Sequence, residues 1–390
     1  MLRLRDRTFA RFVLPVLLAS AGYGLSLQPA EAKLSSLTNL VVIGDSYSDA
    51  GNSGLLTNAI SPPGYPYPYY ADGRYSNGPV TLEQVWTQIN PLLPLLKPSQ
   101  SPGGTNYAVG GATSGINNFA TVDPNMPNNL RSSYDNTSAH SQLSQVLGRF
   151  TPGSFDPNST LFALWLGPND ALYWLHTQPA PAENGYTPGT ITGGAPVQAT
   201  GNELLTNLLT NINIGLESLV AGGAKHVLVP NLMDFSKAPA FSGNPTLAAT
   251  IQALSLGFNQ GLDQVVTQVR TNHPTVDIID FDTAALFDDI FTNPGSYGFS
   301  NTTEACTSIT TPTAFTAGCS PTAPGWLFWD GVHVTTAGHA VIASQMVQSV
   351  YEVPGPLPAI GGVVALGWAR RLRCRVRQGQ GTAMTTTAGR

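Results

Sequence analysis

The sequence predicts a three-layer α/β/α domain built on a parallel sheet. Short apolar, β-branched runs alternate with longer stretches of helical periodicity, which is the pattern of stacked βαβ units. Two runs, LVVI at 40–43 and LFALWL at 161–166, are apolar throughout, as strands buried on both faces are. Both end abruptly in glycine and polar residues. Because open α/β sheets bind ligands at the carboxyl ends of their strands, we expect both endings to meet at one site.

Five strands and the helices between them account for this architecture. The expected strands cover 40–43, 106–109, 161–166, 226–229 and 276–279. The expected helices cover 81–89, 202–221, 246–270 and 335–351. Hydrophobic residues make up 42% of the 390 residues, and glycines and prolines lie between the apolar runs as turn residues do. The composition therefore favours one large domain with a sizeable core.

The charge is distributed unevenly along the chain. The segment 33–352 holds 21 acidic residues against 8 basic ones, whereas most of the arginines lie at the two ends. An excess of 13 negative charges over this segment would repel a polyanion. We therefore expect no binding of nucleic acid.

Residues 1–32 predict a signal peptide. An apolar stretch at 12–27 leads to Ala30, Glu31 and Ala32, which place small residues where signal peptidase reads them. The basic residues that precede it are Arg3, Arg5, Arg7 and Arg11. We expect the mature chain to begin at Lys33 in an exported bacterial protein, located in the periplasm, on the cell surface or outside the cell. The alternatives are a surface-anchoring amphipathic helix or a short membrane helix.

Residues 353–390 have the features of a sorting tail. VPGPLP at 353–358 precedes a short apolar run at 359–369, and five arginines follow between 370 and 377. The run is about half the length that spans a bilayer, so we expect only transient membrane contact during export. The tail resembles the PEP-CTERM sorting signals of bacterial exported proteins, although no glutamate follows Pro354. The alternative is a frayed terminal helix with a basic, solvated end.

Cysteine usage agrees with an oxidising compartment. Cys306 and Cys319 flank a loop rich in threonine and proline, and we expect them to close it with a disulfide. Cys374 lies in the tail and has no evident partner. No spacing of the cysteines suggests a metal site.

A candidate nucleophile follows the first strand. GDSYSD at 44–49 places the Ser46 hydroxyl on a tight turn, where it can face the crevice at the end of the sheet. A serine with neighbouring glycine and aspartate is also an ordinary helix N-cap. Taken alone, the motif favours the N-cap.

A candidate acid and base follow near the carboxyl end. In FWDGVH at 328–333, a turn would let the Asp330 carboxylate reach the His333 ring, fix its tautomer and stabilise the imidazolium that forms when it accepts a proton from serine. His339 lies on the next expected helix beside apolar residues, which is typical of a packed or solvated histidine.

Two further motifs can supply hydrogen-bond donors to a developing oxyanion. GPND at 167–170 ends the tryptophan-containing strand, and NYAVGGA at 106–112 covers the expected strand at 106–109 and the glycines that follow it. The Asn169 amide and a backbone N–H freed by a glycine are donors of the required kind. Both motifs also have structural readings, as turn residues and as a site of close backbone packing.

In this order and spacing the four motifs resemble the blocks of the GDSL/SGNH hydrolases, a family of lipases and esterases. Gly44, Asp45 and Ser46 match the nucleophile block, with Tyr47 where the family name has leucine. The resemblance extends from Leu40 to about residue 351, and it implies a flavodoxin-like fold for a hydrolase domain at 33–352.

The resemblance also implies roles for individual residues. The N–H groups of Ser46 and Gly111 and the side chain of Asn169 would form the oxyanion hole. Asp330 would orient His333, which would act as general base and then as general acid. GRYSNGP at 73–79 is a further match, whereas Val334 stands where many members have proline, a change expected to loosen the loop without removing a chemical group.

The leading interpretation is an ester hydrolase that works through an acyl-enzyme on Ser46 and needs no cofactor. Its substrate would be a lipid, a short soluble ester or an acetylated polysaccharide. The tyrosines at 65–70 suit sugar stacking or a lipid-facing rim, or simply a rigid loop. The alternatives are a catalytically silent surface or matrix protein on the same scaffold, and an acyltransferase. The sequence does not indicate the oligomeric state.

Overall fold

A computed structural model describes residues 37–149, 155–177, 200–308 and 314–351. The expected signal peptide at 1–32, the tail at 353–390 and Cys374 lie outside these ranges. Within them, no helix combines the length and the apolar character needed to cross a bilayer.

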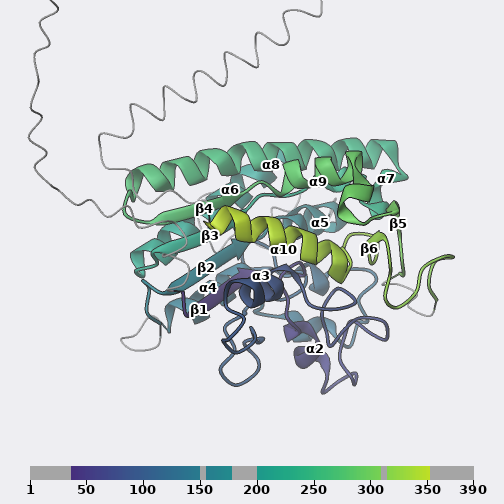
Figure 1. The fold of residues 1–390 in the computed structure, drawn as a ribbon, viewed down its shortest axis with the longest axis horizontal. Helices are drawn as coiled ribbons and strands as arrows, with labels where there is room; N and C mark the ends of the chain where they lie inside the picture. Colours follow the sequence, from purple (N-terminus) through teal and green to yellow (C-terminus); the bar gives the residue numbers. More distant parts are fainter. Residues whose placement is uncertain (1–36, 150–154, 178–199, 309–313, 352–390) are drawn as a thin grey trace, which may run out of the picture.

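A four-stranded parallel sheet forms the centre of the fold (Figure 1). Its strands, in spatial and sequence order, are β1 (Asn39–Gly44), β2 (Thr160–Trp165), β3 (His226–Pro230) and β4 (Asp277–Phe281). The pairing of β1 with β2 runs in register from Asn39 opposite Thr160 to Gly44 opposite Trp165. The polar segments after these two strands therefore begin side by side, as the sequence predicts.

Helices cover both faces of this sheet, which confirms the three-layer architecture (Figure 1). On one face α3 (Thr81–Ile89) packs against α10 (Thr336–Tyr351), and on the other α6 (Gly201–Ala221) packs against α8 (Pro245–Asn272). All four were predicted, with ends within two residues of those observed. Local signals fix two of their starts: a Thr200–Glu203 capping box begins α6, and the Asn244 side chain caps α8.

The expected strand at 106–109 is not a regular strand. This segment runs beside β1, where the Tyr107 N–H donates to the Val42 carbonyl at 2.8 Å, but only one isolated bridge joins the two. On its other side the Asn52 amide donates to the carbonyls of Asn106 and Ala108, both at 2.8 Å. The Asn52 side chain thus satisfies backbone carbonyls that would otherwise lack a partner at the edge of the sheet. The segment is held in place by these bonds without forming a fifth strand.

Several shorter elements were not predicted. They are α2 (Asn52–Thr57), α4 (Ala139–Leu147), α5 (Pro168–Thr177), α7 (Pro239–Ser242), α9 (Thr283–Thr292), β5 (Asn301–Ala305), β6 (Trp326–Phe328) and the 3₁₀ turns η1 (Phe119–Thr121), η2 (Arg131–Tyr134), η3 (Phe235–Lys237) and η4 (Pro294–Tyr297). β5 and β6 pair with each other in a separate small sheet. The sequence of β5, NTTEA, has no apolar run from which a strand could be predicted.

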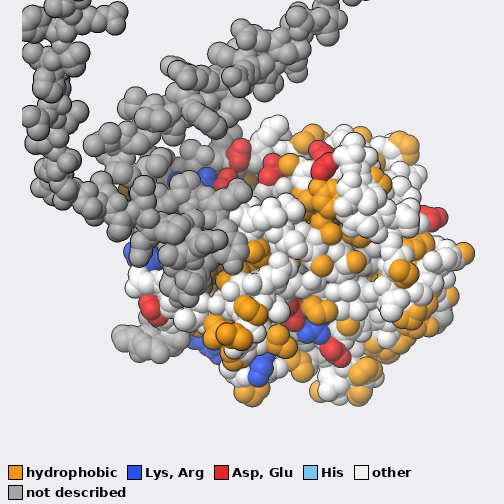
Figure 2. Space-filling model, viewed as in Figure 1, with side chains coloured by type: hydrophobic (Ala, Val, Ile, Leu, Met, Phe, Trp, Pro, Cys, Tyr) orange, Lys and Arg blue, Asp and Glu red, His pale blue; other side chains and the backbone are white. Residues whose placement is uncertain are grey.

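The main core lies between the sheet and its helices, where the side chains of β1 and β2 are almost fully buried. A second, smaller cluster surrounds the Cys306–Cys319 disulfide, whose Cα atoms are 5.4 Å apart, and includes Tyr70, Trp326 and Trp329. The face shown in Figure 2 carries few charged side chains, and its hydrophobic side chains are scattered among polar ones. The disulfide cluster matters for the site because Trp329 directly precedes Asp330.

Candidate active site

Ser46 lies in the turn that follows β1. The Gln142 side chain holds the last residue of this strand, accepting from the Gly44 N–H and donating to its carbonyl, both at 2.9 Å. Ser46 caps no helix, since α2 begins only at Asn52 and has Gly51 as its N-cap. The structure therefore does not support the N-cap reading of the motif. The Ser46 side chain lies at a cavity instead.

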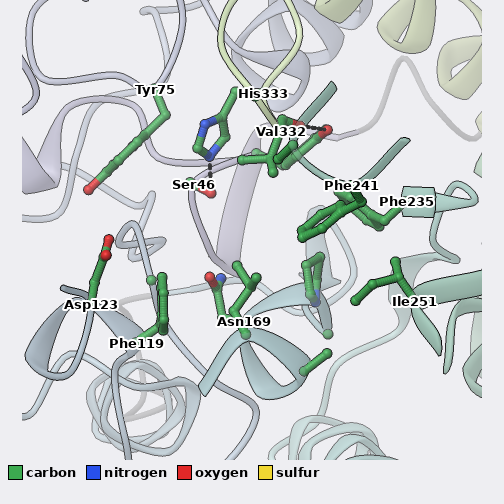
Figure 3. Close-up of a pocket in the computed structure, with 18 of the residues that line it drawn as sticks. Ser46, Tyr75, Phe119, Asp123, Asn169, Phe235, Phe241, Ile251, Val332 and His333 are labelled. Atoms are coloured by element: carbon green, nitrogen blue, oxygen red, sulfur yellow. Dashed lines mark hydrogen bonds between the residues drawn. The ribbon is translucent and has the colours of Figure 1, made fainter. Parts of the chain in front are cut away.

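Ser46, His333 and Asp330 form a continuous hydrogen-bonded chain. Figure 3 shows its link between Ser46 and His333. The Ser46 Oγ lies 2.8 Å from His333 Nε2, across a sequence separation of 287 residues. On the other side of the ring, His333 Nδ1 lies 2.8 Å from Asp330 Oδ2 and 2.9 Å from Oδ1. With Nδ1 protonated, Nε2 is free to accept the serine proton.

Asp330 is held in its charged form. Burial opposes the charge, but His333 and the N–H groups of Val332 and His333, which donate to Oδ1 at 2.9 and 2.8 Å, outweigh it and lower the pKa of Asp330. Tyr70 adds a further donor, because its hydroxyl lies 2.8 Å from Oδ2. A charged, fully bonded carboxylate is suited to orient an imidazole and to stabilise its protonated form.

Replacing Tyr70 by phenylalanine should lower kcat by about tenfold or more, because a hydrogen bond to a charged group is worth roughly 1.5–3 kcal/mol. The phenylalanine ring retains the edge contact with Trp329. Steady-state kinetics together with the midpoint of thermal unfolding check this. An unchanged kcat at an unchanged midpoint would show that the Tyr70 hydroxyl has no part in positioning Asp330.

Asn169 and Gly111 line the cavity beside Ser46. Asn169 belongs to the first turn of α5, and its amide points toward Ser46 (Figure 3). Asp45 precedes Ser46 in the same turn, where it accepts from the Tyr47 N–H at 3.0 Å, and burial raises the pKa of Asp45 to about 7. Gly111 has a φ of 78°, and a Cβ there would come within 2.3 Å of Asn118 Oδ1, so only glycine fits.

Asp49 links the Ser46 turn to the glycine segment. One carboxylate oxygen accepts from the N–H groups of Gly51 and Asn52 at 2.8 and 2.6 Å, and the other accepts from the Gly110 N–H at 3.0 Å. This carboxylate thus fixes Gly111 relative to the turn that carries Ser46. The motif at 44–49 was read for its serine, and the bracing role of its last residue was missed.

The segment at 73–79 holds the loop that carries His333. Ser76 Oγ donates to the Val334 carbonyl at 3.0 Å, and the Asn77 side chain accepts from the Thr336 N–H at 2.8 Å. On the other side of His333, the Tyr47 hydroxyl donates to the Val332 carbonyl at 2.6 Å. Tyr47 therefore does more than occupy the leucine position, because it fixes the backbone next to His333.

His339 is a packed core histidine, in agreement with the structural reading of the sequence. It is 1% exposed, and its Nδ1 accepts from the Thr81 N–H at 3.2 Å. Burial, with a smaller contribution from the charge of His333, lowers the pKa of His339 to about 3. His339 is therefore neutral in the folded protein at neutral pH.

This histidine should make the fold sensitive to acid. Because its pKa is lower in the folded than in the unfolded chain, its contribution to stability is complete above about pH 6.5 and is lost as the pH falls toward 3, by about 1.4 kcal/mol per pH unit. Urea unfolding of wild type and His339→Asn between pH 7 and 4.5 isolates the effect. The stability advantage of wild type should shrink across this window, and a constant difference would contradict the assignment.

The cavity has a volume of about 460 Å³, which is within the range of small-molecule sites. Besides the residues already named, apolar side chains from α5, α6 and α8 line it. In the described parts of the chain, no group of three or more histidine, cysteine or acidic side chains could hold a metal ion. The site can therefore transfer the proton of the Ser46 hydroxyl to His333, next to a cavity with a largely apolar lining.

An α/β sheet with serine, histidine and aspartate at its carboxyl edge is one architecture of serine hydrolases. A model of the GDSL-like Lipase/Acylhydrolase family matches residues 40–346, most of the chain. The protein belongs to this family, whose activity is of the esterase and lipase type.

Among its relatives, GDSL esterase/lipase At1g29670 of Arabidopsis thaliana is 27% identical over 353 residues, covering 84% of this chain and 91% of that protein. The phosphatidylcholine-sterol acyltransferase of Aeromonas hydrophila is 25% identical, covering 84% of this chain and 95% of its own length. The crystal structure of Axe2, an acetylxylan esterase from Geobacillus stearothermophilus, is similar with a TM-score of 0.37 and 13% identity, over 80% of this chain and 93% of that one.

Proposed function

We propose that the protein is a carboxylic ester hydrolase that works through an acyl-enzyme on Ser46. The observation that carries this proposal is the hydrogen-bonded chain from Ser46 through His333 to Asp330, which opens on the cavity at its serine end. A protein that only binds ligands has no need for this chain or for an asparagine amide directed at the serine.

In the proposed reaction His333 Nε2 takes the proton as Ser46 Oγ attacks the acyl carbon. The N–H groups of Ser46 and Gly111 and the Asn169 amide stabilise the oxyanion. His333 then donates its proton to the leaving alcohol, and a water activated by the same nitrogen releases the acid. Asp330 stays ionised throughout, which the low pKa of this carboxyl favours.

Hydrolysis of p-nitrophenyl esters and of acetylated polysaccharides, compared between wild type and Ser46→Ala, tests the proposal. Wild type should release p-nitrophenol from at least one ester, and the variant should not. If only the polysaccharide is hydrolysed, and its acetate release requires Ser46, the proposed mechanism stands and the substrate is a sugar ester. Equal rates for both proteins would overturn the proposal.

We further propose that the protein is exported and processed at its amino end. The Cys306–Cys319 disulfide supports this, because structural disulfides persist in oxidising compartments. Amino-terminal sequencing of the protein recovered from outside the cytoplasm should give Lys33 as the first residue. Recovery of the unprocessed chain in the cytoplasm would contradict the signal-peptide assignment. Residues 353–390 stay a proposed sorting tail.

A further inference from the structure

The cavity extends from Ser46 in two directions of different chemistry. In Figure 3, Tyr75, Phe119 and Asp123 lie on one side of Ser46 and Asn169, whereas Phe235, Phe241 and Ile251 lie on the other. We name the first the polar arm, because Asp123 places a carboxylate there beside the Tyr75 and Phe119 rings, and the second, whose labelled side chains are all apolar, the apolar arm. An ester also has two parts, an acyl group and an alcohol, that extend in different directions from the carbon that Ser46 attacks.

The apolar arm is built from side chains that the fold has already buried. Phe241, Ile251 and Phe258 are 7%, 4% and 2% exposed, and they come from α7 and α8. Of the residues of α8 that line the cavity, only Ser255 has a polar side chain. An acetylated sugar placed here would lose hydrogen bonds to water without replacing them, whereas a hydrocarbon chain would gain from its transfer out of water.

The polar arm lies beside the group that must protonate the leaving alcohol. The rings of Tyr75 and His333 are 5.0 Å apart, centroid to centroid. Asp123 and Asn125 add a carboxylate and an amide to the lining, and among the described residues no lysine or arginine lines the cavity. An alcohol leaving along this arm would be close to the histidine proton and would meet polar partners.

We propose that the apolar arm is the acyl site, that Phe241 and Ile251 limit the length of chain it accepts, and that the polar arm takes the alcohol. The preferred substrates are then esters of unbranched, medium-length fatty acids with a polar alcohol, rather than acetyl esters. The proposal rests on the proposed function of Ser46. It goes further by assigning each side of the cavity to one half of the substrate.

The test compares kcat/KM for the acetyl, butyryl, octanoyl and palmitoyl esters of p-nitrophenol. For wild type we expect roughly a hundredfold rise from butyryl to octanoyl, the gain that burying the added methylenes gives. Ile251→Trp fills the apolar arm and should remove most of this hundredfold preference, so that the ratio of kcat/KM for the octanoyl ester to that for the butyryl ester falls toward one. Leu256→Trp introduces a tryptophan on the same helix at a position that is 53% exposed, and it should leave every ratio unchanged.

Phe241→Ala is a second variant that does not depend on accommodating a larger side chain. It should widen the arm and raise palmitoyl turnover relative to octanoyl. A wild type that hydrolyses acetyl esters best through Ser46, or an Ile251→Trp variant that lowers all four rates equally, overturns the acyl-site assignment while the proposed function stands. Absence of any Ser46-dependent hydrolysis overturns both.

Discussion

Ser46→Ala and His333→Ala should each lower kcat for ester hydrolysis by roughly 10⁵- to 10⁶-fold, because nucleophile and base act as one unit. For the same reason the double variant should be no worse than either single one. The two side chains are joined directly, Oγ to Nε2 at 2.8 Å, so removal of either leaves no activated nucleophile. Steady-state kinetics of the three variants measure the effect.

The fold should survive both changes, since both side chains line the cavity. Circular dichroism and thermal unfolding of each variant provide the control. Additive losses in a folded double variant would show that Ser46 and His333 do not act together, and near-normal turnover by Ser46→Ala would place the nucleophile elsewhere.

Asn169→Ala should lower kcat by roughly a hundred- to a thousandfold, the range for loss of one oxyanion donor, with a smaller change in KM. Asn169→Asp is the matched variant. It keeps the shape of the side chain but replaces the donating amide with a carboxylate, and it should be at least as impaired. An effect confined to KM would make Asn169 a residue that positions the substrate.

The sequence predicts a helix or strand well where the hydrophobic pattern lies within the element itself. The apolar run at 40–43 and the periodicity of the four long helices identify their elements within two residues. The prediction of a strand at 106–109 was wrong. The side chain of Asn52, a residue distant in sequence, bonds to the backbone of this segment in place of a neighbouring strand. α5 was missed because GPND is equally good as a turn, and only the structure shows that helix α5 begins within it.

For the candidate site, the order of the four motifs identifies the residues of the site. It does not identify the neighbouring side chains that position them. Ser46, Asn169, Asp330 and His333 were all selected from sequence, and the structure brings them to one cavity. Tyr70 was missed because its loop offered three readings and nothing local connects it to a carboxylate 260 residues away.

The contact of the Tyr47 hydroxyl with the Val332 carbonyl and the bracing of the glycine segment by Asp49 were also missed. These contacts join segments that are distant in sequence, and the residue types involved are common in turns. A single sequence therefore gives no pattern that distinguishes such a brace from an ordinary turn residue.

Covalent trapping can show whether Ser46 is the nucleophile. A fluorophosphonate reacts with an activated serine and stops at a stable adduct, so peptide mass spectrometry locates the nucleophile without knowledge of the natural substrate. We expect stoichiometric labelling on Ser46 and a large loss of labelling rate in His333→Ala. Labelling at another serine, or no labelling of the folded wild-type protein, would contradict this role of Ser46.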